Sequence, residues 1–178
     1  MANEKKRLSN ISIEDARLVF KNFSGKEGKF NPSGKRNFCV VLTPEIANEL
    51  RADGWNVKES PSKIEGEEPL LYLPVAVAFG DYPPKIILIT SHGKTKVGEE
   101  EVNTLDWADI ETADVIVNPY QYEVNGRSGV KAYLKALYVT IREDQFESKY
   151  FDVPDTAENT IHCDHCTGCG DCQRAGEV

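Results

Sequence analysis

The stretch that decides the fold reads ADVIVNPYQYEV (residues 113–124), NGRSG (125–129) and VKAYLKALYVTI (130–141). Its two flanking runs are rich in β-branched and aromatic residues, which are typical of strands. The asparagine and the two glycines between them accept the positive φ angles that a hairpin loop needs. The stretch therefore predicts a β-hairpin, the clearest structural signal in the chain.

Shorter runs predict further strands. Apolar or alternating residues occur at 11–23, 37–42, 55–58, 70–79 and 85–90. Their short lengths and β-branched content favour strands over helices. The runs at 70–79 and 85–90 are joined by Gly80-Asp-Tyr-Pro-Pro84, and we expect them to pair as a hairpin in the core.

The run at 11–23 changes its alternation near Asp15, which indicates a bulge or bend. The residues expected to point inward are Ala16, Leu18 and Phe20. Those expected on the outer face are Arg17, Val19, Lys21 and Phe23. Because a purely structural face does not need alternating basic and apolar side chains, this outer face is a candidate binding surface.

One helix is predicted with defined ends. Thr43-Pro44-Glu45 supplies an N-cap, a proline at the first helical position and an acid in the first turn, and Gly54 follows the expected end near Asp53. A single helical turn is also expected near 105–110. With about seven strands and no alternation of strands and helices, the fold class predicted is mainly β (α+β), an OB-like antiparallel β-barrel with one helix after an early strand.

The 178 residues suffice for one domain and some extra sequence. We expect a flexible N-terminal segment over 1–9, the OB-like domain over 10–150 and a flexible, acidic, cysteine-rich tail over 151–178. The first ten residues, MANEKKRLSN, contain no apolar segment, and no run is long enough to span a bilayer. The sequence predicts a cytoplasmic protein that does not bind membranes.

The net charge of −8 argues against nucleic acid until its distribution is considered. Residues 1–43 carry nine Lys and Arg against four acids, and 115–142 carry four against one. The acids gather instead at 97–114, with seven and no base, and at 143–178, with nine against two bases. Basic segments that also bear aromatic residues are typical of single-strand binding.

The loop 24–37 resembles a phosphate-binding P-loop only superficially, because five residues separate Gly28 from Gly34 and Arg36 follows Lys35. Its bases and aromatics instead predict contacts to phosphates and bases of a single strand, as does the Lys-Tyr-Lys alternation of 131–135. The candidate nucleic-acid-binding residues are Arg17, Lys21, Phe23, Lys26, Lys29, Phe30, Lys35, Arg36, Phe38, Tyr120, Tyr122, Arg127, Lys131, Tyr133 and Lys135.

Five segments together carry a family resemblance. They are 10–31, 35–42, the helix end 53–58, Pro83-Pro-Lys-Ile86 and Val124-Asn-Gly-Arg-Ser-Gly-Val-Lys-Ala-Tyr-Leu-Lys135. These segments resemble a family of bacteriophage single-stranded-DNA-binding proteins over most of residues 10–150. The resemblance implies an OB-type barrel that acts in phage DNA replication and recombination, in the host cytoplasm, with the basic loops and aromatics as its DNA groove. It does not extend to the cysteine-rich end.

That end contains Cys163, Cys166, Cys169 and Cys172, with His162 and His165 beside them. Thiolates at this density can hold Zn²⁺ or an iron–sulfur cluster, and zinc is favoured because the spacing differs from that of bacterial ferredoxins. The separation between paired knuckles that structural zinc sites show is also missing, so a reactive tail without metal stays open. No cofactor is required by the rest of the sequence.

No catalytic set is recognisable, since His92 has no partner at a known spacing, and we predict no enzyme activity. The expected partners are single-stranded DNA and, through the acidic tail, replication or recombination proteins. Two alternatives remain: a metal- or redox-dependent protein that uses the cysteine cluster, and an acidic inhibitor of a host factor. Oligomeric state is not readable from the sequence.

Overall fold

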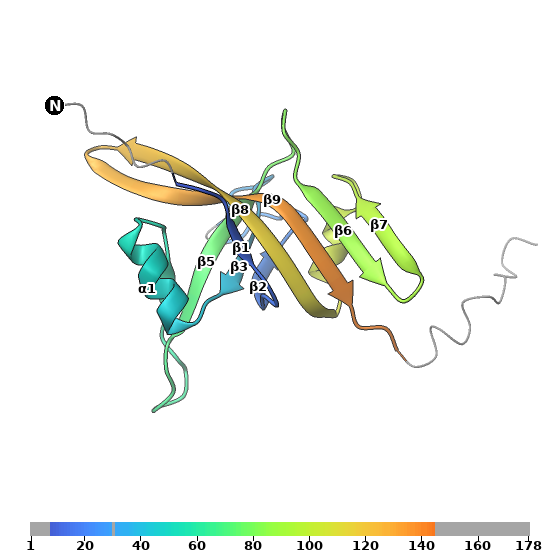
Figure 1. Cartoon of the computed structure of the whole chain (residues 1–178), viewed down its shortest axis with the longest axis horizontal. Helices are drawn as coiled ribbons and strands as arrows, with labels where there is room; N and C mark the ends of the chain where they lie inside the picture. The colour runs from blue at the N-terminus through green and yellow to red at the C-terminus, as the bar shows by residue number, and fades with distance from the viewer. Residues whose placement is uncertain (1–7, 30, 145–178) are drawn as a thin grey trace, which may run out of the picture. The chain divides into compact units, whose positions relative to one another are not determined.

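The computed structural model describes residues 8–29 and 31–144. This part of the chain contains nine strands, one α-helix and one 3-10 turn (Figure 1). In chain order they are β1 (Ile11–Ile13), β2 (Leu18–Asn22), β3 (Arg36–Val41), α1 (Pro44–Ala52), β4 (Lys58–Ser60), β5 (Leu70–Val77), β6 (Lys85–Thr90), β7 (Gly93–Val97), η1 (Val102–Asp106), β8 (Ile110–Val124) and β9 (Arg127–Ile141).

The long hairpin is formed by β8 and β9, as the sequence predicts. The two strands pair in antiparallel register up to Val124 opposite Arg127, which leaves a two-residue turn. Asn125 and Gly126 occupy this turn with φ angles of 52° and 74°. Asn-Gly is the preferred pair for such a turn because both positions need positive φ. The turn is therefore tighter than the five-residue loop predicted, and Arg127 belongs to β9.

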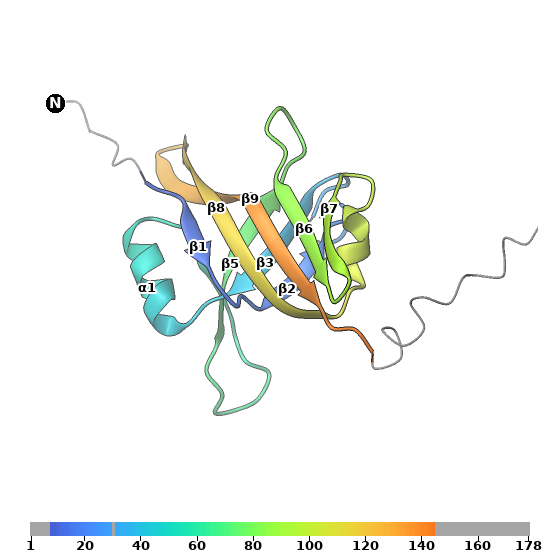
Figure 2. The same ribbon diagram turned by 45° about the vertical axis from the view of Figure 1, so that its right-hand side comes forward.

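The sheet closes through the N-terminal segment. Strands are ordered β1-β8-β9-β5-β3-β2, so β1 and β2 lie at the two ends although they are adjacent in sequence. Between them Ala16 donates its N–H to Ala113 of β8 at 2.7 Å, and Arg17 accepts from Val41 of β3 at 3.0 Å. The backbone bends at Asp15, whose φ is 49°, where the shift in alternation predicts it. One bent segment thus joins both edges into the predicted OB-like barrel (Figure 2).

The predicted hairpin between residues 70–79 and 85–90 is wrong. β5 and β6 do not pair with each other; both run parallel to β9, where β5 meets residues 132–133 and β6 meets 136–140. The linker between them ends in Pro83-Pro84, and a residue that precedes a proline is restricted to extended backbone. The chain therefore continues in the same direction along β9. The hairpin partner of β6 is β7, which the sequence analysis did not predict.

The helix α1 begins and ends close to the predicted residues. The Thr43 hydroxyl accepts from the Ile46 N–H at 3.5 Å, Ala47 and Leu50 pack into the core, and Gly54 has φ +86° after the end. The strand predicted at 55–58 is shifted, since β4 begins at Lys58. The predicted turn near 105–110 corresponds to η1, which lies a few residues earlier.

Candidate nucleic-acid interface

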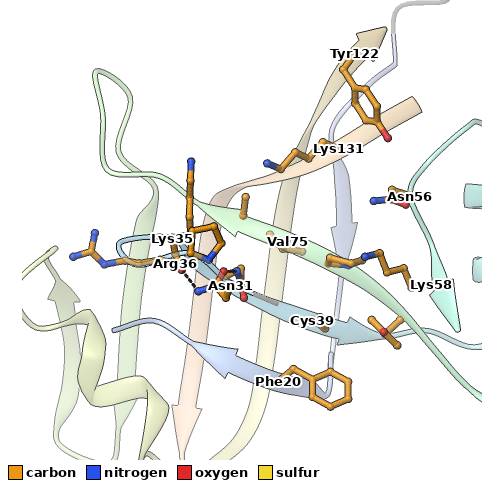
Figure 3. A pocket seen from close by; sticks show the side chains of 15 residues that line it. Phe20, Asn31, Lys35, Arg36, Cys39, Asn56, Lys58, Val75, Tyr122 and Lys131 are labelled. Carbon is orange, nitrogen blue, oxygen red and sulfur yellow. Dashed lines mark hydrogen bonds between the residues drawn. The ribbon is translucent and has the colours of Figure 1, made fainter. Parts of the chain in front are cut away.

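A pocket of about 830 Å³ lies on the outer face of β3 and β5 (Figure 3). It is lined by Phe20, Asn31, Pro32, Lys35, Arg36, Asn37, Cys39, Asn56, Lys58, Tyr72, Pro74, Val75, Ala76, Tyr122 and Lys131. We call this pocket the groove. Four of the fifteen residues are Lys or Arg, and none is Asp or Glu. The groove is therefore positive although the chain is acidic.

The alternation of the strands explains which residues face the groove. On β5 the side chains of Leu73, Val75 and Val77 are buried, so the intervening residues of the strand point outward. The register aligns Cys39 with Pro74 and Asn37 with Ala76 across β3 and β5. These short side chains leave room for a ligand between the longer basic and aromatic residues around them.

The four cations come from separate elements. Lys35 and Arg36 lie at the start of β3, Lys58 begins β4 opposite Tyr72, and Lys131 is on β9 near the hairpin turn. Figure 3 shows Arg36 and Lys58 at opposite ends of the groove, with Lys131 between them on the side of the hairpin. Three of these residues were predicted as nucleic-acid contacts, and Lys58 was missed because it stands in a short mixed segment without a pattern of its own.

Phe20 is the aromatic residue that the sequence analysis placed wrongly. Its side chain is 61% exposed, and its ring lies edge-on to Tyr72 with centroids 5.4 Å apart. The cause is a second irregularity in β2, because Phe20 has φ 50° and the pairing with β3 shifts between Val19 and Asn22. The shift reverses which side chains point inward.

Burial overturns two predicted site residues. Phe23 and Phe38 are both fully buried, and their rings stack at 5.2 Å in the core. Neither ring can accept a base in this structure. Phe23 was predicted on the outer face from an alternation that the shift at Phe20 interrupts, and Phe38 points inward between outward neighbours on β3.

The tyrosines of the long hairpin lie on and beside the groove. Tyr122 lines it and covers Gly129, where an added Cβ would lie 2.7 Å from the Tyr122 hydroxyl. Tyr120 is 57% exposed and meets Tyr133 edge-on at 5.7 Å, and the Lys131 ammonium lies 5.1 Å from the Tyr133 ring centroid. These rings extend the aromatic surface along the hairpin.

Other predicted residues lie outside the groove lining. Arg17 and Lys21 line a different pocket of about 420 Å³ together with Asp15, Asp109 and Glu111. The Lys21 ammonium also donates to the Ala108 carbonyl at 3.1 Å, which gives it a structural role. Lys26, Lys29, Arg127 and Lys135 are exposed but do not line the groove. Phe30 lies outside the described residues.

Asparagines brace the loop between β2 and β3 at the edge of the groove. The Asn31 amide donates to the Lys35 carbonyl at 2.7 Å and to the Lys26 carbonyl at 3.2 Å. The Asn37 side-chain amide donates in turn to the side-chain oxygen Oδ1 of Asn31 at 2.6 Å. These bonds use the amide groups to hold the loop, so the two side chains are not free to read base edges.

The one cysteine in the groove lining does not ionise at physiological pH. Burial raises the pKa of the Cys39 thiol to about 11, against a smaller lowering by the Lys58 ammonium, so the thiol is neutral at physiological pH. Over residues 8–29 and 31–144, no three His, Cys, Asp or Glu side chains come together as a metal site. The predicted ligands Cys163, Cys166, Cys169 and Cys172 lie outside these ranges.

The described part of the chain also has no helix long and apolar enough to cross a membrane.

A closed β-barrel with a positive groove flanked by exposed aromatic rings is typical of modules that bind single-stranded nucleic acid. The chain belongs to the family of putative phage single-stranded-DNA-binding domains, whose model matches residues 1–177. This match confirms the resemblance inferred from the sequence. It also extends beyond it, because it includes the cysteine-rich end that the resemblance left out.

Solved structures with the same fold come from bacteriophage Enc34. The fold is similar to its single-stranded-DNA-binding protein with a C-terminal truncation, at a TM-score of 0.51 and 8% identity over 76% of this chain and 87% of that one. The same protein in complex with single-stranded DNA matches with 0.51 and 8% over 76% and 88%. A third structure of it matches with 0.50 and 10% over 80% and 90%. No curated protein matches the chain.

Proposed function

We propose that this chain binds single-stranded DNA in the groove and protects it, with little sequence preference, during phage DNA replication and recombination. Family membership supports the ligand class. The observation that carries the location is the lining of the groove, which combines four cations with no acid on an otherwise acidic protein.

Phosphate neutralisation accounts for affinity. Lys35, Lys58 and Lys131 are exposed on three different elements around the groove, so a strand crossing it meets a cation on each side. Each phosphate contact releases counterions, and single strands lose about 0.7 of a logarithmic unit in affinity per contact for each tenfold rise in salt. The Coulomb attraction for phosphate is confined to the groove, because no Asp or Glu belongs to its lining.

Stacking accounts for the preference for single strands. Phe20, Tyr72 and Tyr122 present rings to the groove, and a base can stack on them only when it is unpaired. Every base has a π face, so stacking discriminates little between sequences. The engaged amides of Asn31 and Asn37 remove two groups that would otherwise read base edges.

The test is a titration with fluorescent oligo-dT at several salt concentrations, with a duplex of equal length for comparison. The double variant K58A/K131A should flatten the salt slope by about 1.4, which corresponds to two lost phosphate contacts. The matched control K63A/K94A removes two exposed lysines outside the groove and should leave the slope nearly unchanged. Equal affinity for the duplex, or equal slopes for the two variants, would contradict the proposal.

The wider role follows from the same proposal. We expect binding without catalysis, in the host cytoplasm, and recruitment of replication or recombination proteins by the acidic residues from Glu143 onward. The negative charges of this segment also compete with the DNA phosphates for the groove. Deletion from Pro154 should tighten binding to oligo-dT at low salt, and the difference should fade at high salt. Weaker binding of the shortened chain would show that the segment contributes to DNA contact.

A further inference from the structure

Trp107 is far more exposed than a tryptophan of a packed barrel needs to be. Its side chain is 82% exposed, although tryptophan is highly buried on average in folded proteins. Trp107 follows η1 directly, and its backbone N–H donates to the Thr104 carbonyl at 3.2 Å. The backbone is therefore fixed while the indole projects into solvent.

The neighbouring residue fastens this turn to the loop after β2. The two carboxylate oxygens of Asp106 accept from the N–H groups of Phe23 at 2.7 Å and Ser24 at 2.9 Å. Figure 2 shows the helical turn between β7 and β8 beside this loop. The backbone that carries Trp107 and the loop that follows β2 are thus held together by the fold.

A cation accompanies the indole. The Lys26 ammonium lies 5.4 Å from the centroid of the Trp107 ring. Lysine and tryptophan from two different segments form the same pairing of charge and π face that Lys131 of the groove forms with Tyr133 beside it. This pairing serves single-strand binding because the ring takes a base while the ammonium takes the adjoining phosphate.

The pair is connected to the groove on two sides. Residues 98–107 reach the groove through Glu99, which forms an ion pair with Arg36 at 2.9 Å. The Lys26 carbonyl accepts from the Asn31 amide, and Asn31 lines the groove. These two contacts place the segment that carries Trp107 and the loop that carries Lys26 beside the Arg36 end of the groove.

We infer that Trp107 and Lys26 form a second base-stacking site, which extends the path of single-stranded DNA beyond the groove. The inference rests on the proposed function, because it adds a stacking position to the same ligand. The ligand of this second site is an unpaired base with its phosphate, and not a protein surface. It also lengthens the footprint of the protein past the loop between β2 and β3.

Tryptophan fluorescence tests the inference directly, since the chain has two tryptophans and Trp55 is buried. Oligo-dT of twenty nucleotides should quench the tryptophan emission of the wild-type protein, and W107F should bind without that quenching. W107A should weaken binding about 5- to 100-fold, the range expected for the loss of one stacked base. K26A should lower the salt slope by about 0.7.

The matched control is Y82A, because Tyr82 is 94% exposed and does not line the groove. If wild-type protein binds DNA without quenching and W107A binds as tightly as Y82A, the inference is wrong while the proposed function stands, and Trp107 then serves another partner such as a protein. If wild-type protein does not bind oligo-dT at all, the proposed function fails and the inference with it. Thermal unfolding of W107A near the wild-type midpoint confirms that any loss of affinity is local.

Discussion

The Arg36 guanidinium in the groove is held by Glu99, with 2.9 Å between Nη1 and Oε1. Glu99 belongs to the acidic segment before η1, and the side chain of Arg36 is 25% exposed. A DNA phosphate must therefore compete with this carboxylate. E99Q should tighten binding to oligo-dT about two- to fivefold at low salt, the range of an exposed ion pair, and the gain should shrink at high salt. Equilibrium titration at two salt concentrations measures the effect.

Glu100 provides the control for this prediction. E100Q removes the same charge from the next residue, which is exposed and outside the groove lining. If E99Q and E100Q tighten binding equally, then general charge and not release of Arg36 is responsible.

Phe20 is predicted to contribute to binding without contributing to stability. Its ring is 61% exposed and touches Tyr72 only edge-on. F20A should weaken binding to oligo-dT by about 1 to 3 kcal/mol, the cost of one lost stacking position. The midpoint of urea unfolding should change little. Unchanged affinity with a clear loss of stability would assign Phe20 a packing role.

Phe23 is predicted to behave in the opposite way. Its ring is fully buried and stacks on Phe38 in the core. F23A should lower the free energy of unfolding by about 3 to 5 kcal/mol because the substitution leaves a cavity. DNA affinity of the protein that remains folded should be close to wild type. The comparison with F20A separates the exposed ring on β2 at the groove from the buried ring that follows the strand.

The elements that were predictable depend on local chemistry. The Asn125-Gly126 turn and the Thr43 cap each require particular residues at particular positions, so the β8–β9 hairpin and α1 could be predicted from sequence. The bend at Asp15 was also visible, as a break in alternation. The shift at Phe20 left no such break, because apolar residues occur on both faces of the strand. That single shift accounts for the errors at Phe20 and Phe23.

Non-local pairing explains the remaining differences. The parallel pairing of β5 and β6 with β9 depends on which edge of the hairpin is open, and no short stretch of sequence encodes that choice. Lys58 reaches the groove because β4 pairs with β5 and sets it opposite Tyr72. Trp107 had one available signal, since a tryptophan between acidic residues is an unusual candidate for a core.

The cysteine-rich end carries a prediction from the sequence alone. If the thiolates at 163, 166, 169 and 172 act as four ligands, protein purified anaerobically should contain about one zinc ion per chain. Replacing these four cysteines with serine should abolish the metal content measured by mass spectrometry. C39S is the control, since Cys39 is a buried thiol of β3 that does not belong to the cluster at 163–172 and should not affect the metal. Metal-free wild-type protein would leave a reactive tail as the interpretation.

Cys39 makes stability depend on pH in the alkaline range. Burial raises the pKa of its thiol to about 11, whereas a thiol in an unfolded chain ionises near 8.5. Above pH 8.5 the unfolded chain releases this proton and the folded chain keeps it. Ionisation of the thiol therefore stabilises the unfolded state relative to the folded state. The contribution is present below pH 8.5 and is lost as pH rises toward 11, by about 3 kcal/mol in total. Urea unfolding of wild type and C39A should therefore converge with increasing pH, because other titrating groups are shared and C39A lacks the thiol. A difference between the two proteins that stays constant from pH 8 to pH 10.5 would mean that the thiol titrates alike in the folded and unfolded chain.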